Sequence, residues 1–495
     1  MKKLSVKYCL MITVLFFNIC MKSQTQISDS ILNINPINLG KNIIENPKGL
    51  ERTFLKLKSI KDGKDSILVV VHFGDSHVQM GHFSGKIKQN LQYEFGDCGD
   101  GILFPYSACK SIGPRNLKSQ FNGLWDHNNI TSVPNKINIG IKGYSLRTKD
   151  TLSNFSLNYI PDTSIHKLIN IKKIKIFHGN NNYQIVLNNQ HSDIILPSEN
   201  ISSNFEISSI NAPLVSSDLS FKLIKTSESQ SEFIFHGIFF ESDQIRGVQY
   251  HQCGVVGAQF LQLIKYSPFF MEQLIALKPN LIIFSYGSNE SYLRNFDALK
   301  YKNEVSVFLE KLKKELPQIE FLFTTTPDTR SNNQFPIYTN EINNTQREIA
   351  NRNNSALWDL NTIMGGENSM KIWHQNGLAN NDKLHFLKSG YLIQGNLFSL
   401  SFFNAINNKF PNSIKTESLI SEINNQFLSF KKNKTIEIDK SKLPKKRKYI
   451  VKKGDTMLKI SNKNNCSIQS IMKANNLTTK IIKVGETFII IPNSL

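Results

Sequence analysis

Ser66–Phe73 reads SILVVVHF and continues directly into Gly74-Asp75-Ser76-His77. A continuous apolar, β-branched run is typical of a strand that is buried on both faces in a parallel sheet. An amphipathic pattern follows from Phe83 to Tyr93, so the stretch predicts a strand, a tight turn and a helix. Ser76 then lies in a turn at the carboxyl edge of the sheet, where open α/β sheets hold their functional sites.

The same pattern recurs later in the chain. Further buried strands are expected at 280–286 (NLIIFSY), 319–325 (IEFLFTT) and 356–360 (ALWDL), with helical sequence between them, for example at 269–277. This alternation predicts a doubly wound α/β domain with a parallel sheet. Residues 118–242 instead contain short alternating segments separated by Asn, Gly and Ser, which predicts a β-sandwich inserted into that domain.

Length and charge restrict the protein class. The chain has 495 residues, with 59 Lys and Arg against 39 Asp and Glu, for a net charge of +20. At roughly 150 residues per domain this length suggests about three folded units. The basic residues are scattered, and the one dense cluster, 442–448 (KLPKKRK), has no interleaved aromatic residues. No nucleic-acid partner is therefore expected; attraction to an anionic cell envelope and a solvated linker are the two remaining interpretations.

Residues 1–23 combine early lysines with an apolar run that is too short for a membrane span of about 20 residues. A secretory signal peptide cut near Ser23 is favoured; a lipoprotein signal using Cys20 and an uncleaved anchor are the alternatives. We therefore expect export to the periplasm or cell envelope, with no transmembrane segment in the mature chain. Export would permit a disulfide between Cys98 and Cys109, which the sequence leaves open.

Four separated blocks carry residues that suit acyl transfer. A serine such as Ser76 needs a base to act as a nucleophile, and Asp382-Lys-Leu-His385 places a carboxylate where it can orient an imidazole. Gly287-Ser-Asn-Glu290 follows a predicted strand and puts an amide at the same sheet edge. Gly254-Val-Val-Gly257 could supply a glycine N–H for a developing oxyanion.

These blocks, in this order and each after a strand, resemble the four blocks of the SGNH (GDSL) hydrolases over about 50–117 and 245–410. The resemblance implies that Ser76 is the nucleophile, His385 the base and Asp382 the residue that orients it. It also implies an oxyanion hole. The donors of that hole would be the N–H groups of Ser76 and Gly257 and the side chain of Asn289.

Two positions depart from the family pattern. Glu290 stands where the family often has Asp, and HVQ follows Ser76 where many members read LT. The HFGDSH block, the β insert and the YHQCGVVGAQF stretch resemble the peptidoglycan O-acetylesterase branch, whose members carry such a carbohydrate-binding-like insert. His72, His77 and His82 do not share one helical face, so no metal site is expected. No cofactor is expected either.

The C-terminal unit gives a second, independent signal. After a polar, Lys-rich linker predicted at 413–448, residues 449–495 show a β-α-α-β pattern that resembles a LysM domain, with YIVKKGDT, KANNL and KVGETFIIIP. The resemblance implies binding of N-acetylglucosamine-containing glycans, chiefly peptidoglycan. The matching positions are Gly454, Asp455, Thr456, Met457, Leu477 and Ile481.

Together these features predict a signal peptide (1–23), a hydrolase domain in two parts (45–117 and 243–412), the inserted β-sandwich, the linker and the LysM domain. We expect an exported serine esterase that removes O-acetyl groups from a cell-wall glycan, most simply peptidoglycan. The alternatives are an acetylesterase or acyltransferase for another polysaccharide, and a peptidoglycan-binding protein without catalytic activity.

Overall fold

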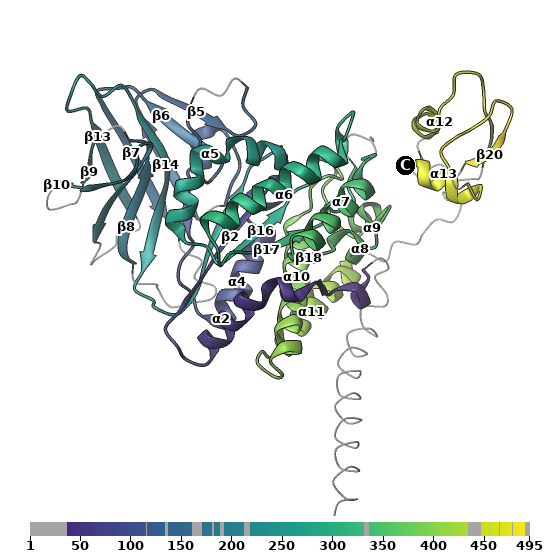
Figure 1. Cartoon of the computed structure of the whole chain (residues 1–495), viewed down its shortest axis with the longest axis horizontal. Coiled ribbons are helices and arrows are strands. Elements are labelled where there is room, and N and C mark those ends of the chain that lie inside the picture. The colour runs from purple at the N-terminus through teal and green to yellow at the C-terminus, as the bar shows by residue number, and fades with distance from the viewer. Residues whose placement is uncertain are drawn as a thin grey trace, which may run out of the picture.

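The computed structural model describes residues 37–490, apart from 115, 134–136, 161–170, 181–182, 189–192, 212–217, 331–335, 434–446, 465 and 478. The predicted signal peptide and most of the basic cluster fall outside these residues. Within them, no helix combines the length and the apolar character needed to cross a membrane. The chain forms a mixed α/β body, a β-rich body inserted into it and a small C-terminal unit (Figure 1).

A six-stranded sheet is the centre of the α/β body, in the order β1-β18-β17-β16-β2-β15. All neighbouring pairs are parallel except β1 with β18. The predicted strands at 66–73, 280–286, 319–325 and 356–360 all belong to this sheet, and the predicted mixed α/β content is confirmed. The strands are β1 (Ile44–Glu45), β2 (Ile67–Gly74), β15 (Gly247–Gly254), β16 (Leu281–Ser285), β17 (Glu320–Thr324) and β18 (Ala356–Trp358).

Strand β15 was not expected from its sequence. It reads GVQYHQCG, which is neither a continuous apolar run nor a strict alternation, yet it pairs with β2 along its whole length, from Gly247 opposite Ile67 to Gly254 opposite Gly74. Its buried His251 is satisfied: Nδ1 accepts from the backbone N–H of Ile102 at 3.0 Å, and Nε2 lies 2.9 Å from the Gln249 side chain. A polar residue can therefore occupy the core side of this strand.

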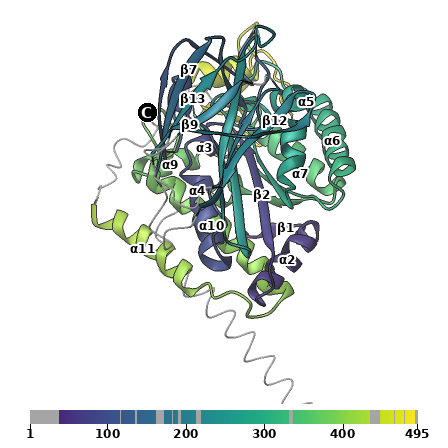
Figure 2. The same cartoon turned by 90° about the vertical axis from the view of Figure 1, so that its left-hand side faces the viewer.

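Helices cover both faces of the sheet (Figure 2). Alternate residues of β2 face opposite ways: Val71 and Phe73 join the core beneath α5 and α6, whereas Leu68 and Val70 join the core beneath α2, α4 and α10. The helices are α2 (Glu51–Lys61), α3 (Ser76–Gln79), α4 (Phe83–Phe95), α5 (Phe260–Leu277), α6 (Ala298–Glu315), α7 (Thr339–Arg352), α8 (Leu360–Ile363), α9 (Ser369–Gln375) and α10 (Lys388–Lys409).

Helix α5 begins at Phe260, earlier than the helix predicted at 269–277. Gln259 and Gln262 form a reciprocal capping box at its start, which satisfies backbone N–H groups that the first turn leaves free. Pro268 lies inside the helix. The longer helix begins directly after the Gly254–Gly257 loop and so fixes where that loop ends.

The insert consists of two antiparallel sheets packed face to face. One has the order β10-β9-β13-β7-β4 and the other β11-β12-β8-β14-β6-β5, with β3 also paired to β14. Phe155 of β7 contacts Phe235 of β14 across the interface, with ring centroids 5.4 Å apart. The strands are β3 (Ile102–Leu103), β4 (Leu117–Asn122), β5 (Trp125–Asn129), β6 (Tyr144–Thr148), β7 (Leu152–Tyr159), β8 (Ile171–His178), β9 (Gln184–Asn188), β10 (Asp193–Ile195), β11 (Ser198–Ser202), β12 (Phe205–Asn211), β13 (Asp218–Ile224) and β14 (Phe233–Ser242).

Part of the predicted linker at 413–448 is wrong, because 417–433 form helix α11 (Glu417–Asn433). Leu419 and Ile423 are buried in the core under α10, and Glu422 forms a 2.9 Å ion pair with Lys86 of α4. A few apolar residues at helical spacing are enough to bury this helix. The overall polar composition of the segment hides that spacing.

The C-terminal unit has its own small core. Strands β19 (Arg447–Ile450) and β20 (Thr487–Ile490) pair antiparallel around helices α12 (Met457–Lys463) and α13 (Ile468–Ala474). The predicted βααβ order is thus present. The buried residues of this core are Val451, Met457, Ile460, Cys466, Ile471, Phe488 and Ile490.

All four cysteines in the described part of the chain are buried free thiols: Cys98, Cys109, Cys253 and Cys466. The disulfide that the sequence left open between the first two is not formed.

Because the C-terminal unit has a separate core, we predict that it folds alone. A fragment of residues 447–495 should show a cooperative thermal transition by circular dichroism. Deleting everything after Asn433 should leave the transition temperature of the remaining chain unchanged within about 1 °C, because that part keeps its buried contacts. A large loss of stability in the truncated chain would contradict this separation.

Candidate active site

Ser76, His385 and Asp382 form one hydrogen-bonded relay. Strand β2 ends at Gly74, and Ser76 is the first residue of α3. Its Oγ lies 3.0 Å from His385 Nε2, and His385 Nδ1 lies 2.8 Å from Asp382 Oδ2. Both distances are within hydrogen-bond reach, as a nucleophile, its base and an orienting carboxylate require.

The loop that carries the base is shaped by Asp382. Its Oδ1 accepts hydrogen bonds from the backbone N–H groups of Leu384 at 2.9 Å and His385 at 3.0 Å. Partial burial opposes ionisation, but these bonds and the His385 ring outweigh it and lower the pKa of Asp382. The anionic Oδ2 then accepts a hydrogen bond from the protonated Nδ1 of His385, which leaves Nε2 as the acceptor for the Ser76 hydroxyl.

Two glycines let the nucleophile helix lie directly on the sheet edge. A Cβ on Gly74 would come 2.3 Å from the Val78 side chain and 2.7 Å from the Ser285 carbonyl oxygen. A Cβ on Gly254 would come 2.2 Å from the backbone nitrogen of Gln79. Glycine is therefore required where β2 and β15 end beneath α3.

The three predicted oxyanion donors follow the carboxyl ends of neighbouring strands, and one hydrogen bond joins two of their loops. Asn289 donates from Nδ2 to the Ala258 carbonyl at 2.9 Å, which uses one of its two amide hydrogens. Gly257, next to Ala258, has φ +76° and open space where a Cβ would stand. In the described part of the chain, neither the Gly257 N–H nor the Ser76 N–H has a hydrogen-bond acceptor. The arrangement can thus present several donors to a developing negative charge.

Gln79 connects several elements of the site, and the sequence did not single it out. Its Oε1 accepts from the Val256 N–H at 2.7 Å and from the Tyr144 hydroxyl at 3.0 Å. Gln79 therefore connects α3, which begins with Ser76 and is called the nucleophile helix below, to the insert. It also connects α3 to the Gly254–Gly257 loop, which carries a predicted oxyanion donor and is called the oxyanion loop below. The signal for Gln79 was the HVQ triplet, in which the chain departs from the common family pattern.

Two buried carboxyl groups lie beneath the site. Asp75 caps α3 by accepting from the His77 N–H at 2.9 Å, and Glu290 accepts from the Phe260 N–H at 2.7 Å, at the start of α5. Burial raises the pKa of each to about 7, and the charge of Asp75 adds to the rise for Glu290. Glu290, which the sequence marked only as a departure from Asp, thus anchors the helix behind the oxyanion loop.

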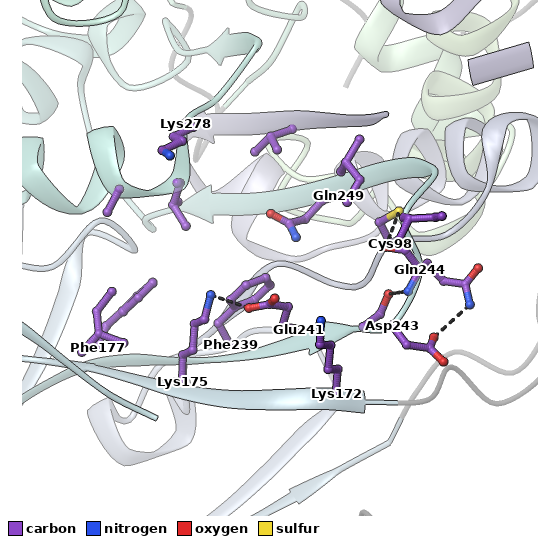
Figure 3. A pocket seen from close by; sticks show the side chains of 17 residues that line it. Cys98, Lys172, Lys175, Phe177, Phe239, Glu241, Asp243, Gln244, Gln249 and Lys278 are labelled. Atoms are coloured by element: carbon purple, nitrogen blue, oxygen red, sulfur yellow. Dashed lines mark hydrogen bonds and ion pairs between the residues drawn. The ribbon is translucent and has the colours of Figure 1, made fainter. Parts of the chain in front are cut away.

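A cavity of about 550 Å³ lies elsewhere, between the insert and the start of β2 (Figure 3). Ile67 and Val69 line it, whereas Ser76 follows the opposite end of that strand. Lys175 and Glu241 form an ion pair within it, and burial raises the pKa of the Cys98 thiol to about 12. The cavity is separate from the triad, and its thiol remains protonated near neutral pH.

The six positions predicted to contact glycan have different environments in the C-terminal unit. Gly454 (φ +87°) and Asp455 form a turn, in which Asp455 accepts from the Tyr449 hydroxyl at 2.8 Å, and Thr456 caps α12. The Met457 side chain is buried in the core of this unit. The remaining two positions also differ: Leu477 packs against this core, and Ile481 is exposed.

Comparison with protein families gives two matches. The family GDSL-like Lipase/Acylhydrolase matches residues 239–398, and the LysM domain family matches residues 449–490. The chain contains a GDSL-type hydrolase domain and a LysM domain. Both predicted families are confirmed, and with them the predicted esterase class. The GDSL match contains the second, third and fourth blocks; the first block, with Ser76, precedes the insert.

Solved structures extend the comparison to the fold. A structure described as "Peptidoglycan O-acetylesterase in action" is 20% identical, covers 72% of this chain and 96% of that chain, and has a TM-score of 0.59. A lipase/acylhydrolase from Enterococcus faecalis (20% identity, 32% and 77% coverage) and the acetyl xylan esterase AlAXEase (19% identity, 30% and 79% coverage) each have a TM-score of 0.26. A search of curated protein sequences gives no match.

We predict that Asn289→Ala lowers kcat for an activated acetyl ester by about 100- to 1000-fold with little change in KM. Removing one oxyanion donor typically has an effect of this size on the transition state alone. Steady-state kinetics on p-nitrophenyl acetate would measure it. A change confined to KM would show that Asn289 binds the substrate instead.

We also predict that Glu290→Gln makes stability less dependent on pH. A carboxyl whose pKa is raised to about 7 stabilises the fold below its usual pKa of 4.5, and this contribution is lost as the pH rises through about 7. Wild type should therefore lose stability as the pH rises from 5 to 8, whereas the variant should not. The free energy of unfolding of the variant relative to wild type, measured by urea unfolding, should increase over this range. The exposed Glu310→Gln is the matched control, and equal behaviour of both variants would contradict the prediction.

Proposed function

We propose that this protein is an exported serine esterase that removes O-acetyl groups from peptidoglycan. The observation that carries the proposal is the Ser76–His385–Asp382 relay, with distances of 3.0 and 2.8 Å, in a chain that also has a LysM domain. The LysM domain favours a glycan polymer that contains N-acetylglucosamine. The similar structure named for peptidoglycan O-acetylesterase supports the same substrate class.

The reaction follows from the hydrogen-bond order. Ser76 Oγ attacks the acetyl carbonyl carbon while His385 Nε2 takes its proton, and Asp382 stabilises the resulting imidazolium. The tetrahedral oxyanion receives hydrogen bonds from the N–H groups of Ser76 and Gly257 and from the Asn289 amide. Collapse breaks the ester bond, and His385 protonates the departing sugar oxygen.

The second half of the reaction regenerates the enzyme. Water takes the place of the sugar, and His385 removes its proton as it attacks the acetyl group on Ser76. Acetate leaves and Ser76 recovers its proton. In a transferase, the hydroxyl of a second sugar would take the place of this water.

The exposure of the triad suits a bulky substrate. The side chains of His385 and Asp382 retain 27% and 44% of their exposure, so a glycan strand can reach the base without entering a closed pocket. Tethering by the LysM domain would raise the local concentration of the hydrolase domain on an insoluble polymer. The signal-peptide pattern at 1–23 supports an extracytoplasmic location, where this polymer is found.

We predict that the protein releases acetate from O-acetylated peptidoglycan and not from the same material after mild base treatment. Ser76→Ala should abolish the release but leave co-sedimentation with peptidoglycan intact, because the LysM domain is unchanged. Enzymatic acetate determination would follow the reaction. Turnover of p-nitrophenyl acetate without any acetate release from peptidoglycan would contradict the proposed substrate but would still support esterase activity.

The truncated chain ending at Asn433 separates binding from catalysis. Its rate on p-nitrophenyl acetate should equal that of the full chain, while its rate on insoluble peptidoglycan should fall. Equal losses on both substrates would show that the tail supports the catalytic fold.

A further inference from the structure

A second imidazole lies beside the triad and has no part in the mechanism above. His77 directly follows the nucleophile and is buried, and its ring centroid lies 5.5 Å from that of His385. Its Nδ1 lies 2.8 Å from the hydroxyl oxygen of Tyr391. This is an ordinary hydrogen-bond distance, and a buried hydrogen bond is electrostatically stronger than one in water.

Tyr391 connects this imidazole to the loop of the catalytic base. It is in the first turn of α10 and is fully buried, with its ring edge-on to Phe386 at 5.4 Å and to His77 at 5.8 Å. Burial raises the pKa of the Tyr391 phenol, and the backbone N–H of Phe386 offsets part of this. Phe386 follows His385 in sequence, so Tyr391 contacts the neighbour of the nucleophile and the neighbour of the base.

This link matters because the two catalytic residues come from distant parts of the chain. Ser76 and His385 are 309 residues apart, one above β2 and the other on a partly exposed loop before α10. The hydrogen bonds to Asp382 shape that loop internally. The His77–Tyr391 bond instead fixes the loop and α10 against the nucleophile helix.

We propose that His77 and Tyr391 are positioning residues, whose buried hydrogen bond holds His385 at bonding distance from Ser76. This inference rests on the proposed esterase function of the same site. A misplacement of reacting groups by about 1 Å can cost on the order of 100-fold in rate. The bond therefore acts on turnover more than on substrate binding.

The chemistry of His77 suits positioning and not proton transfer. Burial, with a smaller contribution from the charge of His385, lowers its pKa to about 3. His77 thus stays neutral when His385 becomes an imidazolium during the reaction, and no second positive charge opposes that step.

A matched pair of tyrosine variants tests the proposal. Tyr391→Phe removes the hydroxyl from the positioning bond. Tyr250→Phe removes a hydroxyl from a second buried tyrosine–histidine bond, 2.8 Å long, to His72 within the same sheet. We expect Tyr391→Phe to lower kcat for p-nitrophenyl acetate by roughly 10- to 100-fold with KM within about twofold of wild type. We expect Tyr250→Phe to leave kcat within about twofold of wild type. Both variants should lower the melting temperature by a similar amount.

Substitutions at His77 provide a rescue. An Asn side chain can place a polar atom close to the position of Nδ1, so His77→Asn should retain more of kcat than His77→Leu. If Tyr391→Phe and Tyr250→Phe have the same kcat, or if Asn and Leu at position 77 are equally impaired with a folded protein, the positioning role is overturned.

The activated ester keeps this test separate from the substrate assignment. Wild-type turnover that is lost in Ser76→Ala establishes the working triad on which the variants are compared. Wild-type turnover that persists in Ser76→Ala would overturn the proposed function and the positioning role together. A normal triad with an unimpaired Tyr391→Phe would overturn the positioning role alone.

Discussion

The parallel pairing of β2 with β15 is the constraint on which the site depends. These strands are adjacent in the sheet but are separated in sequence by α3, α4 and the whole insert, and their eight residue pairs run from Ile67–Gly247 to Gly74–Gly254. The pairing brings both final glycines to one edge, where α3 lies on them. The nucleophile turn and the oxyanion loop therefore receive their relative positions from a single register.

The insert is part of this arrangement. One apolar core runs without interruption from Phe73 and Phe284 of the central sheet to Phe155 and Phe221 of the insert. The hydroxyl of Tyr144, in the insert, donates a hydrogen bond to Gln79 Oε1, which also accepts one from the Val256 N–H. A change in the packing of the insert would consequently reach the oxyanion loop through buried side chains, without passing through solvent.

Sequence patterns predicted the parts of the fold that depend on local apolar runs. The strands around Val70, Ile283 and Leu322 are continuous and β-branched or aromatic, and the four family blocks identified the triad that the structure brings together. Strand β15 escaped prediction because it is not a continuous apolar run, and its buried His251 is satisfied by Ile102 of β3 and by Gln249 of its own strand. The roles of Gln79 and Glu290 depend on hydrogen bonds to Val256 and Phe260, which are distant in sequence and so leave no local periodicity.

The four buried cysteines have a consequence for how this chain reaches its native state. Burial raises the pKa of Cys98 and Cys109 to about 12 and of Cys253 and Cys466 to about 11, so the folded protein offers almost no thiolate for disulfide exchange. The unfolded chain has no such protection. In an oxidising compartment the thiols are therefore protected only once the chain has closed around them, in the hydrolase domain and insert for the first three and in the core of the C-terminal unit for Cys466.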